Sequence, residues 1–373
     1  MTTTETRLLT GSLLRVLAAN FGALTALYLL LATVPLYIGA GGSGAVGLAT
    51  GALMVSCMVT EVMTPRLITR YGYRSVLALG LALLGLPALA LPLVSGVDLV
   101  VVLCVLCGLG FGVIVVVAGA LVALLVPPSR RGEGLGLVGV VVSLPGVLGL
   151  PVGVWLAGSA GCSVVFLLAG CAALAGLAVV PWIPAVGAAG SSVGVLAGLR
   201  SPALVRPSLV FFATTSAAGI AAAFLPLAVG NASLALLVQT VTTTFARLFA
   251  GRYGDRHGAG RLLLPGLLAC ALGIFLVVVS PVVAMLVFGA GFGVVQNASL
   301  SVMLQRVAKS EYGTVSAVWN VAYDSGWGLG AAGFGVLAGV TGYGAAFMVT
   351  AGLMLVALRA VDVRGMMSSS GVE

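Results

Sequence analysis

The sequence has very few charged residues. Asp, Glu, Lys and Arg together make up 7% of 373 residues, and there is a single histidine. A soluble globular protein needs about a quarter of its residues charged to cover its surface. Hydrophobic residues reach 61%, and the mean hydropathy is +1.24. These values exclude the soluble protein of two or three domains that the length alone suggests, and they predict a chain solvated by lipid.

Residues that would bind a metal, a cofactor or nucleic acid are also scarce. The six cysteines lie mostly in apolar runs without a neighbouring histidine, so we expect neither a zinc site nor a disulfide framework. Cys104 and Cys107 form a CxxC pattern in an apolar segment, where we interpret them as small packing residues. Gly134, Gly136 and Gly139 match a dinucleotide-binding spacing but lack the required strand. We therefore expect no cofactor, no metal and no nucleic-acid partner, because the arginines are scattered between apolar segments rather than gathered on one face.

Twelve apolar segments are each long enough to cross a bilayer core of about 30 Å, which takes ~20 helical residues. The predicted fold is an all-α integral membrane protein. The predicted spans are 13–37, 45–66, 75–95, 98–125, 133–157, 162–182, 206–229, 232–253, 261–280, 282–306, 312–339 and 343–361.

Positive charge divides cleanly between the two sides of this predicted topology. All seventeen Lys and Arg residues fall in the even-numbered connections or near the termini, and none falls in the odd-numbered connections. Positively charged loops stay in the cytoplasm. We therefore expect a multi-pass protein of the inner (plasma) membrane with both termini cytoplasmic. The predicted division is a first half (1–182), a cytoplasmic linker (183–205) and a second half (206–373).

A short arginine-rich segment occurs once in each half. The second copy, Arg247–Arg261, holds four arginines, one aspartate and the only histidine. The first copy lies 186 positions earlier and is weaker, because it holds fewer charged residues. The matching positions are Pro65, Arg66, Arg70 and Gly72 in the first copy and Gly251, Arg252, Arg256 and Gly258 in the second. Such a repeat indicates a duplicated helical bundle, as in many transporters.

The two copies resemble the loop signature of the major facilitator superfamily, G-x-x-x-D-R-x-G-R-R/K between helices 2 and 3. The first copy departs from the pattern with Pro65 and Thr69 in place of its glycine and aspartate. The resemblance covers essentially the whole chain, and it implies two pseudo-symmetric six-helix bundles with the loops acting as gates. The gating residues it implies, together with Arg247 one turn before the second loop, are Arg70, Gly72, Arg74, Arg247, Gly251, Asp255, Arg256 and Gly258.

Within the superfamily, the chain resembles the twelve-helix drug/proton antiporter-like branch, with two departures. Cys104 and Cys107 stand where that branch has Arg and Gln in its fourth helix. Leu150 separates Gly149 from Pro151 in the fifth-helix pattern of glycines and proline.

Polar side chains inside the predicted helices form the candidate site. Asn320, Tyr323, Asp324 and Trp327 are spaced to share one helical face. Such groups either line a cavity or serve as interhelical hydrogen-bond partners worth about 0.6–2 kcal/mol each. The predicted cavity residues are Asn20, Tyr28, Gln239, Gln296, Asn297, Asn320, Tyr323 and Trp327.

Two carboxylic acids are candidates for proton coupling. Asp324 is about twelve residues into its span, near the bilayer centre, where an aspartate opposes insertion by about 2.5–3.5 kcal/mol. The alternative is a structural Asp that braces Asn320 or a neighbouring helix. Glu61 is the second candidate, and it occupies the place in the first half that Arg247 occupies in the second.

The sequence therefore predicts a monomeric secondary transporter, proton-coupled, that exports a small apolar or amphipathic molecule by alternating access. Import of a nutrient or metabolite is the alternative. A membrane enzyme is disfavoured because His257 and Asp255 have no second group to complete a catalytic site. A non-transporting membrane protein is also disfavoured, because no added soluble domain is apparent.

Overall fold

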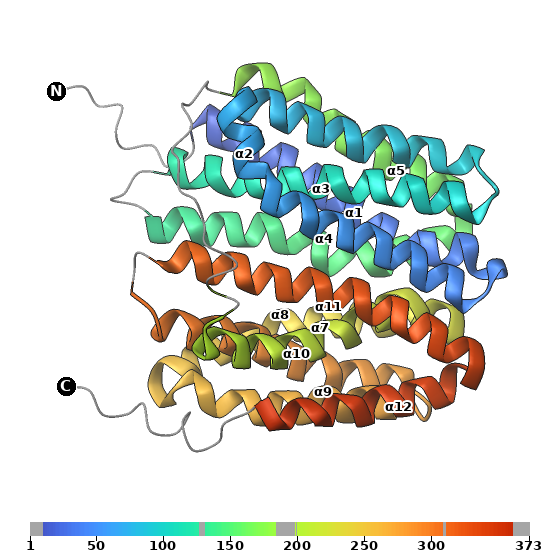
Figure 1. Cartoon of the computed structure of the whole chain (residues 1–373). Coiled ribbons are helices and arrows are strands. Elements are labelled where there is room, and N and C mark those ends of the chain that lie inside the picture. Colours follow the sequence, from blue (N-terminus) through green and yellow to red (C-terminus); the bar gives the residue numbers. More distant parts are fainter. Residues whose placement is uncertain (1–9, 127–130, 184–197, 199, 309–310, 361–373) are drawn as a thin grey trace. The chain divides into compact units, whose positions relative to one another are not determined.

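The computed structural model describes residues 10–126, 131–183, 198, 200–308 and 311–360. Across these residues the secondary structure is helical and contains no strand (Figure 1). This confirms the all-α class, which lipid imposes because helices satisfy their backbone hydrogen bonds internally. The chain forms two compact units. Unit 1 comprises Met1–Tyr37 and Ala52–Ser191, and unit 2 comprises Ile38–Gly51 and Ser192–Glu373.

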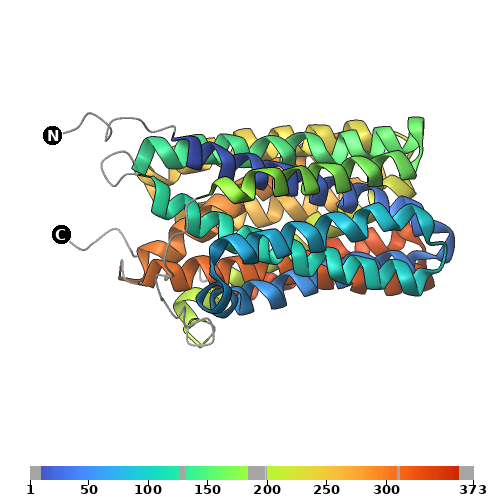
Figure 2. The ribbon, with the colours of Figure 1, turned by 90° about the horizontal axis from the view of Figure 1, so that it is seen from above.

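The helices before residue 183 supply unit 1 and the short segment that joins unit 2. They run nearly parallel or antiparallel to one another, as the view from above also shows (Figure 2). In chain order they are α1 (Gly11–Ile38), η1 (Gly39–Gly41), α2 (Ser43–Ala90), η2 (Leu91–Leu93), α3 (Val97–Leu125), α4 (Arg131–Ala160), α5 (Cys162–Ala175) and η4 (Gly176–Trp182).

Unit 2 is built mainly from the helices after residue 201. Its closest helix pairs are α8 with α10, α7 with α11, and α9 with α10. The elements are α7 (Pro202–Ala228), α8 (Ala232–His257), η5 (Ala259–Leu262), α9 (Leu263–Leu276), α10 (Pro281–Gln305), α11 (Tyr312–Thr341), α12 (Tyr343–Val356) and η7 (Ala357–Ala360).

The observed helices follow the predicted spans closely. Among the described residues, nine helices are long and apolar enough to cross a membrane. Two predicted spans, 45–66 and 75–95, correspond to the single element α2 and the short η2 that follows it, except for the last two residues of the second span. Helix α11 is not among the nine, because polar residues such as Asn320 and Asp324 and its many glycines lower its mean hydropathy. The count of twelve spans remains a prediction.

Glycines form the sharp turns at matching places in the two halves. Gly72 interrupts α2 with φ 77° and ψ 162°, and Gly258 ends α8 with φ 90° and ψ 123°. Only glycine adopts such conformations without strain. The N–H group of Gly258 donates to the carbonyl oxygen of Gly254 at 2.9 Å. The two glycines of the repeated loop signature therefore have the same structural task.

Glycines also let two helix pairs pack backbone against backbone. In unit 1, a Cβ added at Gly108 or Gly112 of α3 would lie 2.0 Å from the Leu53 carbonyl oxygen or 2.4 Å from that of Cys57. In unit 2, a Cβ added at Gly289 or Gly293 of α10 would lie 2.5 Å from the Gln239 carbonyl oxygen or 2.3 Å from that of Thr243. The same contact, with the same four-residue step, therefore occurs in both halves.

The first turns of α2 pack within unit 2 rather than unit 1. A Cβ at Gly47 would lie 2.6 Å from the carbonyl oxygen of Ala331, and one at Gly335 would lie 2.5 Å from that of Ser43. The predicted boundaries at residues 182 and 206 leave this segment of α2 in the first half of the chain, whereas the structure groups it with unit 2. Most of the predicted linker, 184–197 and 199, lies outside the described residues.

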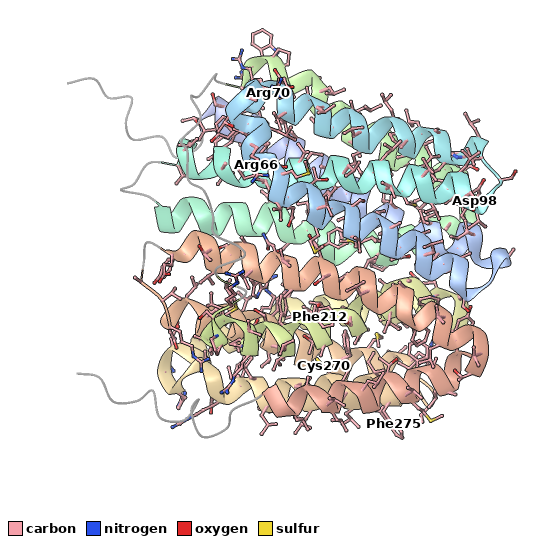
Figure 3. All side chains as sticks on the ribbon, in the orientation of Figure 1. Arg66, Arg70, Asp98, Phe212, Cys270 and Phe275 are labelled. Atoms are coloured by element: carbon pink, nitrogen blue, oxygen red, sulfur yellow. The ribbon has the colours of Figure 1, made fainter. Side chains whose placement is uncertain are left out.

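Charged side chains of unit 1 lie at opposite ends of its helices. Arg66 and Arg70 lie near the kink in α2, whereas Asp98 lies in the first turn of α3 at the other end (Figure 3). The place of Arg66 and Arg70 fits the predicted cytoplasmic side, which remains a prediction. Of the positive residues that define the predicted topology, Arg7, Arg130, Lys309 and Arg364 lie outside the described residues.

Replacing two glycines of α3 by alanine should change stability in opposite directions. Gly108→Ala places a methyl group against the Leu53 carbonyl oxygen, and such overpacking costs about 1–3 kcal/mol. Gly119→Ala meets nothing within 4 Å and gains helix propensity of up to about 1 kcal/mol. Thermal unfolding in detergent measures both variants. Equal shifts of the two melting temperatures would contradict the contact at Gly108.

The predicted topology has a direct test by cysteine labelling. In a background without the six native cysteines, a single cysteine at position 231 should react with a membrane-impermeant maleimide in intact cells. A single cysteine at position 256 should react only after the cells are opened, because arginine-rich loops stay in the cytoplasm. Labelling of position 256 from outside would refute this topology.

Candidate functional site

The polar face predicted on α11 is largely buried. Asp324 is 5% exposed and Trp327 is 4% exposed, while Asn320 and Tyr323 are half-buried. A carboxyl group at this depth is expensive in an apolar helical unit unless it has a partner or a task. The four residues therefore form a polar stripe along a helix that is otherwise rich in small and apolar side chains.

Aromatic rings extend this stripe into a ladder. Trp319, Tyr323 and Trp327 of α11 follow one another with ring centroids 6.1 and 5.9 Å apart. Phe211 of α7 stacks on Trp319 at 4.4 Å, and its centroid lies 6.0 Å from that of Tyr323. The indole N–H group of Trp319 donates to Oγ of Ser299 on α10 at 3.1 Å. The ladder therefore connects α7, α10 and α11.

Trp319 and Phe211 are absent from the predicted site. Trp319 was detectable in principle, since it precedes Tyr323 by four residues and Trp327 by eight, and so falls on the same helical face. Phe211 carries no comparable signal, because its role depends on which helix lies beside α11.

Three buried polar atoms near these helices have no hydrogen-bond partner in the described part of the chain. They are Oε1 of Gln239 on α8, Oε1 of Gln296 on α10 and Nε1 of Trp327 on α11. A buried polar atom without a partner costs about 1–3 kcal/mol, so each one needs an explanation. Two acceptors and one donor, all among the predicted cavity residues, are groups through which a polar solute can be recognised.

Close helix packing fixes the backbones that carry these groups. Gly289 of α10 lies against the backbone of Gln239, and Oγ1 of Thr243 donates to the Gly289 carbonyl oxygen at 3.1 Å. Gly219 of α7 lies against the backbone of Trp327, where an added Cβ would be 2.6 Å from the carbonyl oxygen. Neither contact leaves room for a side chain, so the backbones that carry Gln239 and Trp327 are closely packed.

Asn297 lies on the same side of α10, one turn after Gly293, and faces α8 as well. Its amide is the nearest group to a Cβ added at Gly251 of α8, at 3.5 Å, and its Oδ1 accepts from Oγ of Ser301 at 3.5 Å. The structure therefore places Asn297 beside the start of the second arginine-rich loop. Its role in a cavity remains a prediction.

The two predicted residues of α1 are half-buried within unit 1. Tyr28 packs on α4, where a Cβ at Gly149 would lie 2.4 Å from its own Cβ and one at Gly146 would lie 3.3 Å from its hydroxyl oxygen. The altered glycine pattern of this helix thus accommodates the tyrosine ring. Asn20 is two turns earlier on α1 and is also half-buried.

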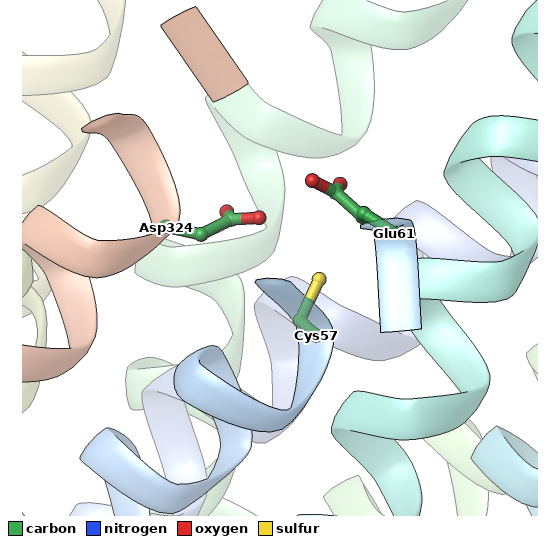
Figure 4. A group of neighbouring side chains, drawn as sticks. All are labelled: Cys57, Glu61 and Asp324. Carbon is green, nitrogen blue, oxygen red and sulfur yellow. The ribbon is translucent and has the colours of Figure 1, made fainter. Parts of the chain in front are cut away.

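Glu61 and Cys57 project from α2, one helical turn apart (Figure 4). The Cys57 sulfur and a Glu61 carboxylate oxygen lie within 4.8 Å of each other. Figure 4 also draws Asp324 on α11 of unit 2. Glu61 is half-buried, whereas Arg247, its counterpart in unit 2, is exposed. Two donor atoms in unit 1 are too few for a metal site, which takes three or four protein ligands.

In the first arginine-rich loop, two side chains have partners inside unit 1. The guanidinium carbon of Arg70 lies 5.3 Å from the ring centroid of Tyr71. Nε of Arg74 donates to the carbonyl oxygen of Ile183, the residue after η4. An arginine at a helix end satisfies a carbonyl group that has no partner within the helix. Arg74 therefore anchors the end of η4, a role that the loop signature alone does not reveal.

In the second loop, the charged residues that are predicted to act in gating are exposed. Asp255 and Arg256 are exposed, and His257 stacks on Tyr253 with ring centroids 4.3 Å apart. Gly251 is half-buried beside Asn297. The loop thus combines a fixed glycine turn with freely accessible charged groups, and its gating role remains a prediction.

The two thiols of the CxxC pattern are packing groups. Cys104 and Cys107 of α3 are buried, and Sγ of Cys107 lies 3.5 Å from the Leu84 carbonyl oxygen of α2. All six cysteines carry free thiols. The predicted packing role fits this geometry.

Comparisons with known proteins agree with this architecture. The structure is similar to the nucleoside transporter NupG, with a TM-score of 0.75, 14% identity and coverage of 95% of this chain and 99% of that one. It is similar to the xylose transporter XylE from E. coli, in a partially occluded inward-open conformation, with a TM-score of 0.74, 14% identity and coverage of 98% and 100%. It is also similar to a bacterial homolog of the human lysosomal transporter Spinster, with a TM-score of 0.78, 14% identity and coverage of 94% of this chain and 95% of that one. At these identities the likeness concerns the fold.

No curated protein matches the sequence. One family model does match, over residues 16–331 and 208–363, and together these stretches cover most of the chain. Its description is the Major Facilitator Superfamily. The repeated loop glycines, the duplicated helix contacts and this match lead to one conclusion: the chain belongs to the Major Facilitator Superfamily.

Proposed function

We propose that the protein is a proton-coupled secondary transporter that exports a small apolar or amphipathic molecule by alternating access. The observation that carries this proposal is the set of three buried polar atoms without partners, on Gln239, Gln296 and Trp327. Trp327 also belongs to the aromatic ladder of α11, the helix that carries the buried Asp324. Groups of this kind are unfavourable for stability in lipid, and a bound solute supplies the partners that they lack.

The chemistry of these groups favours a neutral solute with a flat or apolar surface. The ladder offers the ring faces of Trp319, Tyr323 and Trp327 for stacking, and the glutamines offer acceptors for a hydroxyl or amino group. No lysine or arginine belongs to this set of residues. A strongly anionic solute such as a sugar phosphate would therefore lack a counter-ion.

We assign the proton to Asp324. It is the carboxyl group among the residues of this site, and it is buried in the middle of α11. The charged form of a carboxyl group is costly in such surroundings, so a change in exposure during the transport cycle would change its protonation. Glu61 of unit 1 is the second candidate for this role.

Import is a second candidate direction. Structures with a similar fold include a D-xylose–proton symporter, with a TM-score of 0.77, and a peptide transporter, with a TM-score of 0.76. The name of the first, a proton symporter, favours symport for this chain, whereas the resemblance to drug/proton antiporters favours export. We include in the proposal a monomeric protein in the inner membrane with both termini in the cytoplasm.

Proteoliposomes with a pH-sensitive dye inside test both the function and the direction. The solutes added are nucleosides, sugars, short peptides and apolar amphiphiles. Entry of a solute by proton antiport makes the lumen more alkaline, and entry by symport makes it more acidic. Absence of any pH change and of any solute uptake across the panel would refute the proposed function.

Gln239→Leu should raise stability while weakening solute binding. The substitution removes a buried acceptor that has no partner, so the melting temperature of the protein without solute should rise. Loss of one hydrogen bond to the solute, worth about 0.5–1.5 kcal/mol, should weaken binding up to about tenfold. Thermal unfolding and solute titration measure the two effects.

Thr215→Val is the control for the effect on stability. Its buried hydroxyl donates to the Ala322 carbonyl oxygen at 3.2 Å, so this variant should lose stability. A lower melting temperature for Gln239→Leu, with unchanged binding, would contradict the assignment of Gln239 to the site.

Asp324→Asn should separate binding from proton coupling. Asparagine keeps the shape and hydrogen-bonding capacity of the side chain but cannot carry a proton. We expect the variant to equilibrate solute across proteoliposomes without concentrating it when a proton gradient is imposed. Asp98→Asn, at an exposed carboxyl group in the first turn of α3, is the matched control and should keep uphill transport. Uphill transport by Asp324→Asn would move the assignment to Glu61.

A further inference from the structure

A cavity lies within unit 2, away from the aromatic ladder. Helices α7, α11 and α12 and the start of η7 line a volume of about 940 Å³. This volume is at the upper end of the range for small-molecule sites, about 300–1,000 Å³. The residues that line it are almost all apolar, and they include Phe212 of α7, which is labelled in Figure 3.

The floor of this cavity is closed and its rim is open. On the floor, α11 packs directly on α7, since a Cβ at Gly330 would lie 2.6 Å from the Cα atom of Ser216. Along the rim, Leu329, Leu353 and Val356 are 55%, 62% and 57% exposed. A Cβ added at Gly333 would meet nothing within 4 Å. The cavity is therefore a groove open along the side of the helices.

The groove has the length of an acyl chain in one leaflet. Its lining on α7 runs from Arg206 to Ile220, a rise of about 21 Å at ~1.5 Å per residue. The hydrocarbon core of a bilayer is about 30 Å thick, so one leaflet supplies about 15 Å of acyl chain plus its polar region. A lipid placed lengthwise would have its headgroup at one end of the groove and the end of its tail near the bilayer centre.

Charge at one end of the groove selects the headgroup. Arg206 is the charged residue of the lining, and it is exposed near the start of α7. A second guanidinium group lies at the same end of α7, because Arg306 donates to the carbonyl oxygen of Ala203, three residues before Arg206, at 3.3 Å. Arginine binds phosphate groups through parallel N–H donors, and basic residues at a membrane surface attract anionic lipids.

We propose that this groove is a binding site for one anionic phospholipid. One acyl chain lies against Phe212, Gly333 and Leu353, and the headgroup phosphate lies at Arg206. This assignment does not depend on the proposed transport function, because none of the groove residues belongs to the ladder or to the set of orphaned polar atoms.

Native mass spectrometry of the detergent-purified protein tests the proposal. The probes are phosphatidylglycerol and phosphatidylcholine with identical acyl chains. We expect the first phosphatidylglycerol to bind at least tenfold more tightly than the first phosphatidylcholine. Gly333→Leu, which fills the open groove, should weaken the first binding event for both lipids about tenfold. Arg206→Gln should remove most of the preference for phosphatidylglycerol and leave phosphatidylcholine binding unchanged.

Matched variants outside the groove control for general effects. Gly352→Leu introduces the same side chain at an exposed glycine of α12 that does not line the groove. Arg252→Gln removes the same charge from an exposed position on α8. Both should bind the two lipids as the unmodified protein does. Leu353→Trp, at the exposed rim, narrows the groove without touching its floor and serves as a second blocking variant.

Three outcomes would overturn the proposal. The first is unchanged lipid binding in both Gly333→Leu and Leu353→Trp. The second is that the unmodified protein and Arg206→Gln both bind the two lipids with equal affinity, because the headgroup would then have no role in binding. The third is a dimer that forms without added lipid and that Gly333→Leu abolishes, which would assign the groove to a second copy of this chain.

Discussion

The bilayer places one constraint on this chain from which its other features follow. Backbone polar groups have no water to bind in the hydrocarbon core, so each segment must be helical and the helices must pack on one another. Without a hydrophobic driving force between helices, association depends on close contact of small residues. Gly108 and Gly112 of α3, and Gly289 and Gly293 of α10, provide this contact against carbonyl groups of α2 and α8. These contacts fix the positions from which the functional side chains project.

The same backbone contact carries different chemistry in the two halves. Where Leu53 and Cys57 meet the glycines of α3, Gln239 and Thr243 meet those of α10. One turn further along, Glu61 in unit 1 corresponds to Arg247 in unit 2. The backbone packing, in which a side chain cannot be added, is therefore the same in both halves, whereas the side chains at the matching positions differ. In unit 1, Cys107 of α3 packs beside the Leu84 carbonyl group of α2.

The sequence was sufficient for features that repeat or that depend on hydropathy. The spans, the turn glycines Gly72 and Gly258 and the shared face of Asp324 and Trp327 are local patterns, so one chain reveals them. Contacts between helices are not local. Neither the stacking of Phe211 on Trp319 nor the bond from Arg74 to Ile183 could be predicted, because each depends on which helix lies beside which. The grouping of Ile38–Gly51 with unit 2 has the same origin.

Helix α7 links the two sites that we propose in unit 2. Phe211 stacks on the aromatic ladder, and the next residue, Phe212, lines the lipid groove. Ser216 forms part of the groove floor, and one turn further Gly219 packs on the backbone of Trp327. Because these contacts are backbone to backbone, a shift of α7 relative to α11 would alter both sites together. A lipid that binds more tightly when α7 is in one position shifts the protein toward that position, and the solute site changes with it. The coupling is reciprocal, so the solute changes the affinity for the lipid by the same factor.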